Sequence, residues 1–188
     1  QSVISTSLMF AITAACICVP LALLVVTTSA PRALFSLPLA ISAATLGIGL
    51  IITFNTSPFA WRSERWFIPV IHAVIALPLV IRALEPAAQA IPHSLRNASA
   101  TLGASPFATW VRVELPLLKP ALLRATGLSM AVSLGEFGAT SFLSRSGSTT
   151  LPIAIAQLLG RPGVATQQAG FALAALMVLV TVGVMSRA

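Results

Sequence analysis

Apolar residues are gathered along this chain into long runs, and short polar stretches separate the runs. A helix that crosses a membrane needs about 20 predominantly apolar residues, and five segments approach that length. They cover residues 4–27, 37–54, 66–84, 117–143 and 170–185. We therefore predict five transmembrane helices. Internal prolines such as Pro20 and Pro78 fit this interpretation, because neighbouring helices in a bundle can satisfy the carbonyls that a proline frees.

A sixth apolar piece, residues 151–159, lies between glycine-containing turns. It is too short to span a membrane, so we predict a short re-entrant or interfacial helix on the outer side. The sequence shows no soluble domain and no internal repeat of the solenoid type. We predict an all-α membrane protein with one domain over residues 1–188, built as a bundle of about five transmembrane helices.

The composition supports a lipid environment. Hydrophobic residues make up 57% of the 188 residues and charged residues 8%, whereas a soluble domain has about 25% charged residues. The formal net charge of +7 comes from basic residues that stand singly between apolar runs. This distribution indicates membrane topology and lipid headgroups rather than a nucleic-acid partner.

The chain begins at Gln1, and its first apolar run is too long for the core of a signal peptide. We interpret that run as a membrane helix. We expect the chain to be part of a longer protein.

Residues 92–116 form a polar, basic loop between two apolar segments. Ser94 is placed to cap a first short helix, and Gly103 is placed to end it, because glycine accepts the left-handed conformation at little cost. Ser105 and Pro106 then predict a second helix, with serine as the cap and proline in the first turn. We expect Leu115-Pro116 to end that helix and turn the chain back to the membrane.

The second short helix of this loop carries an aromatic and aliphatic face, formed at i, i+3 and i+4 by Phe107, Trp110 and Val111. Arg112 follows beside that face. Two interpretations are open from the residues alone: a surface for a partner in the water phase, or an ordinary amphipathic loop lying on the membrane surface.

The spacing within this loop resembles the EAA loop of the permeases of ABC importers. That signature reads E-A-A, three residues, G, nine residues, then I-x-L-P. Here Asn97-Ala98-Ser99 is followed by three residues, Gly103, nine residues and Val113-Glu114-Leu115-Pro116. Asn97 stands where the signature has Glu, which removes a charge. Ser99 and Val113 are conservative departures from Ala and Ile.

The resemblance covers nearly the whole chain. Residues 133–140 (SLGEFGAT) and 150–155 (TLPIAI) are similar to the subgroup that includes ferric-iron, thiamine and molybdate importers. It implies a transmembrane permease subunit that forms the substrate path and takes ferric iron or thiamine as its substrate.

The same resemblance implies partners. An ABC ATPase subunit would bind the loop 92–116, an extracytoplasmic binding protein would deliver substrate, and a second permease half would be fused, identical or different. The residues implied in ATPase coupling are Asn97, Ala98, Ser99, Gly103, Phe107, Trp110, Arg112, Val113, Leu115 and Pro116. ATP hydrolysis is expected on the separate chain, because no glycine-rich phosphate loop precedes Lys119, the only lysine.

Orientation follows from the basic residues. With loop 92–116 in the cytoplasm, seven basic residues lie at or near the inside: Arg32, Arg82, Arg96, Arg112, Lys119, Arg124 and Arg187. Four lie outside: Arg62, Arg65, Arg145 and Arg161. The positive-inside rule favours this arrangement in a bacterial inner membrane. Trp61 and Trp66 would then flank the outer interface.

Glu136 is an acid at membrane depth, between Gly135 and Gly138 in the sequence Gly-Glu-Phe-Gly. One hypothesis makes these three residues part of the substrate pathway or a gate, since such acids usually face a bundle interior or a water-filled path. The alternative is a carboxylate near the outer interface, or one bonded to backbone groups that the glycines free. We interpret His72 as a packed, hydrogen-bonded residue. With two histidines and no aspartate, we expect no metal site and no cofactor.

Two other functions compete with the permease interpretation. A secondary transporter driven by an ion gradient would need paired intramembrane charges or inverted repeats, and Glu136 stands alone. An intramembrane hydrolase would need a nucleophile and a base at membrane depth. Ser129 and His72 are available, but no G-x-S-x-G motif surrounds Ser129.

Overall fold

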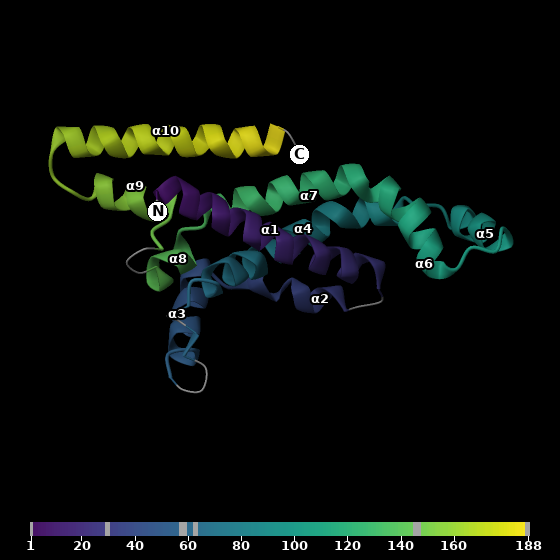
Figure 1. The fold of residues 1–188 in the computed structure, drawn as a ribbon. Helices are drawn as coiled ribbons and strands as arrows, with labels where there is room; N and C mark the ends of the chain where they lie inside the picture. Colours follow the sequence, from purple (N-terminus) through teal and green to yellow (C-terminus); the bar gives the residue numbers. More distant parts are fainter. Residues whose placement is uncertain (1, 29–30, 57–59, 62–63, 145–147, 187–188) are drawn as a thin grey trace.

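The computed structural model describes residues 2–28, 31–56, 60–61, 64–144 and 148–186, and each regular element within them is a helix (Figure 1). The predicted all-α fold is therefore confirmed. In chain order the elements are α1 (Val3–Thr27), α2 (Arg32–Phe35), η1 (Leu37–Ala40), α3 (Ala43–Thr53), α4 (Phe67–Gln89), α5 (His93–Thr101), α6 (Pro106–Thr109), the π-helical turn η3 (Trp110–Glu114), α7 (Leu115–Gly135), α8 (Gly138–Leu143), α9 (Leu151–Leu159) and α10 (Val164–Ser186).

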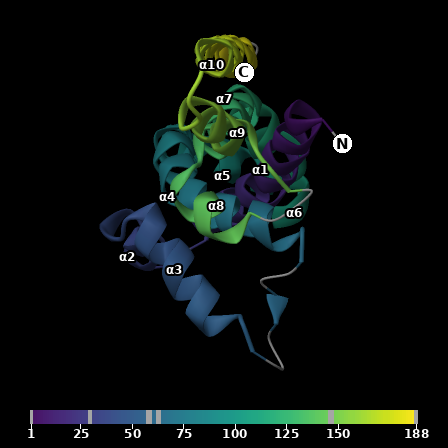
Figure 2. The same cartoon turned by 90° about the vertical axis from the view of Figure 1, so that its left-hand side faces the viewer.

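Helices α1, α4 and α7 lie side by side and form the core (Figures 1 and 2). Phe10 shares one buried apolar cluster with Ile71, and Val25 shares a second with Leu84, so α1 and α4 run in the same direction. The faces in contact are rich in small buried residues: Ala11, Ala14, Ala15, Cys18, Ala22, Ala73, Ala76 and Ala125. Small side chains let helices approach closely, which favours association where lipid offers no hydrophobic driving force.

Four helical segments in the described part of the chain are long and apolar enough to cross a membrane, namely Val3–Thr27, Phe67–Gln89, Pro106–Gly135 and Val164–Ser186. The predicted continuous helix over residues 37–54 is wrong. The chain forms η1, becomes extended at Ile41, and restarts as the 11-residue α3. Ser42 causes the restart, because its side chain accepts a hydrogen bond from the Thr45 N–H and caps the new helix.

The predicted span over residues 117–143 is also different in the structure. It begins earlier, because α6, η3 and α7 form one uninterrupted helical segment, Pro106–Gly135. It ends earlier as well, because Glu136 is extended and α8 starts only at Gly138. The expectation that Leu115-Pro116 ends a helix is therefore wrong. Pro116 directly follows the π-helical turn η3, at the head of α7 and inside that continuous segment.

Helices α9 and α10 cover one side of the core (Figure 2). The predicted short helix at 151–159 is confirmed as α9, and α10 begins at Val164, six residues before the predicted start. Gly170 lets the two helices meet closely, since a Cβ there would lie 2.8 Å from Leu159 Cδ2. Most of α10 is exposed in the isolated chain.

The two ends of the bundle differ. Helices α5 and α6 extend from one end, and α8 and α9 lie at the other (Figure 1). The described basic residues Arg96, Arg112 and Lys119 belong to the α5–α6 end. Arg62, Arg145 and Arg187, which entered the charge comparison, lie outside the described residues.

Candidate functional site

The first short helix of the loop ends as the sequence predicts. Gly103 has a φ of +79°, its N–H donates to the Ala100 carbonyl, and the Ala104 N–H donates to the Ser99 carbonyl. These two bonds form a Schellman motif, which satisfies carbonyls at the helix end. The start differs from the prediction. α5 begins at His93 with Pro92 in the cap position, so Ser94 is not the cap.

The second short helix begins as predicted. Ser105 is the cap, and its side chain accepts a hydrogen bond from the Ala108 N–H, with Pro106 in the first turn. A π-helical turn follows, in which the Leu115 N–H bonds to the Trp110 carbonyl five residues earlier. Such turns insert an extra residue into a helix and often mark functional positions.

An ion pair joins the two halves of the loop. Arg96 in α5 donates from Nε to Glu114 Oε1 over 2.6 Å and from Nη2 to Oε2 over 3.0 Å. Glu114 is buried at 8% exposure, whereas the Arg96 side chain is 43% exposed. These hydrogen bonds raise the pKa of Arg96 above its ordinary value. The pair could not be predicted from the sequence, because a spacing of 18 residues matches no helix or turn repeat.

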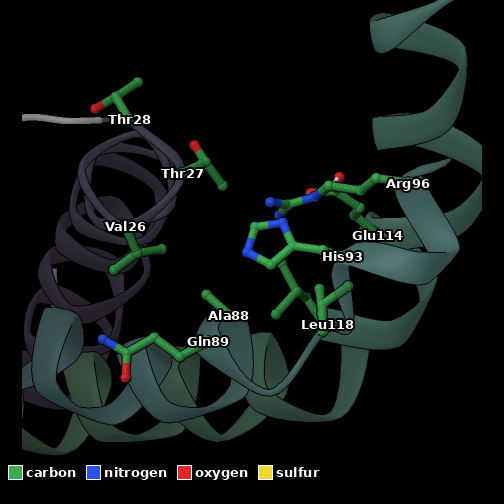
Figure 3. A pocket seen from close by; sticks show the side chains of 10 residues that line it. Val26, Thr27, Thr28, Ala88, Gln89, His93, Arg96, Glu114 and Leu118 are labelled. Atoms are coloured by element: carbon green, nitrogen blue, oxygen red, sulfur yellow. Dashed lines mark hydrogen bonds and ion pairs between the residues drawn. The ribbon is translucent and has the colours of Figure 1, made fainter.

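A cavity of about 330 Å³ lies between this ion pair and the ends of α1 and α4. Figure 3 shows His93 and the Arg96–Glu114 pair on one side of it and Thr27 on the end of α1 on the other. A second cavity of similar size lies between α5 and α6 and is lined by Arg96, Asn97, Ala100, Ala104, Pro106, Thr109 and Glu114.

The loop exposes large apolar side chains. Leu102 is 88% exposed and Phe107 is 73% exposed. The Phe107 ring stacks on Trp110, with centroids 6.3 Å apart. The other predicted coupling residues divide by exposure: Asn97, Ala98, Gly103, Arg112 and Pro116 are exposed, whereas Ser99, Trp110, Val113 and Leu115 are partly buried.

Glu136 occupies the break between α7 and α8, at the opposite end of the bundle. Its Oε1 accepts the Ala139 N–H and its Oε2 accepts the Thr140 N–H, each over 3.0 Å. The Thr140 hydroxyl donates to Oε2 over 2.7 Å. The buried carboxylate thus caps α8 by satisfying freed backbone groups, which is the geometry that the alternative hypothesis described.

His72 from α4 completes a buried polar cluster with these residues. Its Nε2 lies 2.7 Å from Thr140 Oγ1, and its Nδ1 lies 2.7 Å from Ser133 Oγ. The single Thr140 hydroxyl hydrogen is donated to Glu136, so Thr140 accepts from Nε2–H, and Nδ1 of a neutral ring accepts from Ser133. The prediction of a hydrogen-bonded histidine is confirmed. Its hydroxyl partners were missed, because they lie 61 and 68 residues away.

The two glycines beside Glu136 differ in their surroundings. A Cβ on Gly138 would lie 3.0 Å from the Ala43 Cβ and 3.1 Å from the Ala44 nitrogen, so Gly138 permits close packing of α8 on α3. No atom lies within 4 Å of a Cβ built on Gly135. Among the described residues, no three histidine, cysteine or acidic side chains gather as a metal site would require.

Comparison with known proteins places the chain in one family. Residues 6–187 match the family described as "Binding-protein-dependent transport system inner membrane component". A Salmonella typhimurium protein named 2-aminoethylphosphonate transport system permease protein PhnV is 33% identical over 153 residues, which cover 81% of this chain and 57% of PhnV. The chain therefore spans little more than half the length of that relative.

Two further relatives carry other substrate names. The molybdenum transport system permease protein ModB of Haemophilus influenzae is 34% identical and is aligned over 75% of this chain and 68% of its own. The sulfate transport system permease protein CysT of Escherichia coli is 34% identical over 60% of this chain and 44% of its own. The chain belongs to the family of inner-membrane components of binding-protein-dependent transport systems.

Proposed function

We propose that this chain is the permease part of an ATP-driven importer, with loop 92–116 as the surface that couples it to a separate ATPase. The family membership supports a transport role. The observation that carries the coupling role is the exposed apolar surface of Leu102 and Phe107 on a loop whose second helix continues into α7. A partner in the water phase would bury that surface at a favourable free energy.

The structure offers two routes from the loop to the core. α6 continues through η3 into α7 without a break, and the Arg96–Glu114 pair ties α5 to the same segment. Movement of the ATPase would therefore be transmitted to α7 and, at its far end, to the break at Glu136. We propose that Gly135, Glu136 and Gly138 lie beside the substrate path, with the α8 cap opening and closing it.

The names of the relatives favour a substrate class other than ferric iron or thiamine, which the sequence resemblance implied. The relatives named above carry the names of 2-aminoethylphosphonate, molybdenum and sulfate, and none of the three carries iron or thiamine. Phosphonate and sulfate are tetrahedral oxyanions. We therefore favour a small oxyanion, delivered by an extracytoplasmic binding protein to a path shared with a second permease half.

The proposed setting is a bacterial inner membrane with loop 92–116 in the cytoplasm. The test is a cysteine crosslink in the intact transporter, with Cys16 and Cys18 replaced by alanine. Cysteine at Leu102 is paired with cysteine in the groove of the ATPase, and cysteine at Gln157 in α9 serves as the control from the opposite end. A nucleotide-dependent crosslink from Leu102 and none from Gln157 is expected. Equal crosslinking from both positions, or none from Leu102, would contradict the proposal.

A further inference from the structure

A single imidazole ring spans the break between α7 and α8. His72 Nδ1 lies 2.7 Å from Ser133 Oγ, in the last turn of α7, and Nε2 lies 2.7 Å from Thr140 Oγ1, in the first turn of α8. His72 itself belongs to α4. One rigid ring therefore holds the end of one helix and the start of the next against a third helix.

Both bonds of this ring are shielded from water. The exposed fraction is 1% for His72 and for Thr140, and 4% for Ser133. Phe10 of α1 packs edge-on against the His72 ring, with centroids 6.4 Å apart and planes at 90°. Because these groups are shielded, breaking either bond leaves a buried polar group without a partner. The ring therefore resists movement of α8 relative to α4.

The other contacts of α8 restrain it less specifically. The hydrogen bonds of Glu136 go to Ala139 and Thr140 of α8 itself, so this cap does not tie α8 to α4. Ala139 also packs closely on Gly47, which is the one buried residue of α3. The contacts of α8 with α1 and α4 are apolar, through Ala139 and Leu143. Apolar contacts are non-directional, whereas a hydrogen bond fixes both a distance and an angle.

We propose that His72 is a positioning residue of the transport cycle, whose bond to Thr140 holds α8 against α4 and keeps the path beside Glu136 closed. Opening then moves α8 away from α4 and breaks the Nε2–Thr140 bond, while the bond to Ser133 keeps the ring on α7. This inference rests on the proposed function, since it assigns the restraint on the gate proposed there. Loss of one buried neutral hydrogen bond shifts an equilibrium by about two- to tenfold.

Two substitutions separate the two bonds. The amide of His72→Asn reaches the position of Nδ1, so it keeps the bond to Ser133 and loses the bond to Thr140. The amide of His72→Gln reaches the position of Nε2, so it donates to Thr140 and loses the bond to Ser133. Thr126→Val is the control, because it also removes a hydroxyl from the bundle, and that hydroxyl donates to the Leu122 carbonyl within α7.

The experiment uses the complete transporter with its ATPase in proteoliposomes, without binding protein or substrate. It measures kcat and KM for basal ATP hydrolysis, together with hydrogen exchange of the Ser141 and Ser144 amides, which bond within α8 and its break. We expect H72N to raise the basal kcat and the α8 exchange by about two- to tenfold, with the KM for ATP unchanged. H72Q and Thr126→Val should stay close to the unsubstituted chain.

The direction of the change separates positioning from plain stability. A chain that is merely destabilised loses ATPase activity, whereas release of a restraint on the gate raises it. If H72N and H72Q raise the basal kcat equally, or neither raises it, while Leu102 still crosslinks to the ATPase, the role of His72 is wrong and the coupling role stands.

Two further outcomes keep the inference testable. If Leu102 gives no crosslink, the coupling role fails, and unchanged α8 exchange in H72N would overturn the restraint by His72 as well. If H72N does not fold, Thr140→Val removes the same bond from the α8 side and takes its place, with Thr140→Ser as the conservative variant that should restore the basal rate. Equal basal rates in these two variants would contradict the inference.

Discussion

Arg96 and Glu114 form a bidentate ion pair that fastens α5 to the π-helical turn at the head of α7. The two nitrogen–oxygen distances of 2.6 and 3.0 Å match the geometry of charge-assisted hydrogen bonds. Glu114 is mostly shielded, whereas Arg96 remains open to water. The pair therefore fixes α5 against η3 more than it adds to global stability.

The first prediction concerns this pair. Arg96→Ala and Glu114→Gln should each destabilise α5. The double variant should lower the local stability of α5 by less than the sum of the two single variants. Because Arg96 is 43% exposed, the coupling energy should be about 1 kcal/mol or less. Hydrogen exchange of the α5 amides measures it. Arg112→Ala is the control, because that exposed cation has no partner among the described residues; an equal effect from it would contradict the prediction.

A second prediction follows from the backbone at Gly103. Its φ of +79° is strained for a residue with a Cβ, although the space around it is open. Gly103→Ala should destabilise the α5 end by about 1 kcal/mol, and Gly103→Asn should cost less because asparagine tolerates this conformation. Hydrogen exchange at Ala104 reports the change. Gly183→Ala in α10, also in open space, should have no such effect.

Two glycines of α3 give a matched pair for the third prediction. A Cβ on Gly47 would lie 2.8 Å from the Ala139 Cα, whereas a Cβ on Gly49 meets no atom within 4 Å. Gly47→Ala should destabilise the α3–α8 contact by about 1–3 kcal/mol through overpacking. Gly49→Ala should be neutral or slightly stabilising. Unfolding in detergent compares the two, and similar midpoints would show that α3 does not pack on α8 in this way.

The fourth prediction addresses the buried polar cluster. Thr140→Val keeps the shape of the side chain but leaves His72 Nε2–H without an acceptor and removes one donor from Glu136. Leaving a buried polar group unsatisfied costs about 1–3 kcal/mol. Thr140→Ser retains the hydroxyl and should lose much less stability. Thermal unfolding of the purified chain, with transport measured in parallel, would test this, and equal destabilisation by serine and valine would argue against the hydrogen-bond assignment.

Local chemistry made part of this structure predictable. Gly103, Ser105 and Pro106 act on the backbone within a few residues of themselves, so their effect on the loop could be inferred from the sequence. Leu115-Pro116 misled the prediction, because Pro116 follows a π-helical turn inside a continuous helical segment and does not end a helix. Proline alone does not distinguish a helix start from a helix end.

Contacts between distant segments could not be inferred in the same way. Neither the Arg96–Glu114 pair nor the His72 bonds to Ser133 and Thr140 has a spacing that a helix or turn imposes. An apolar composition also did not predict whether a helix is continuous. Residues 37–54 are apolar enough for a span, but Ser42 caps a new helix inside them, and Glu136 does the same for α8 by bonding to the backbone.

The length of α7 has a mechanical consequence. The helix contains 21 residues, so it is about 32 Å long, and each degree of tilt about one end displaces the other by about 0.6 Å. The hydrogen bonds of the Glu136 cap lie between 2.7 and 3.0 Å, and such bonds tolerate about half an ångström of change. As a lever pivoting at its Leu115 end, this helix needs a tilt of about one degree to strain a cap at its far end.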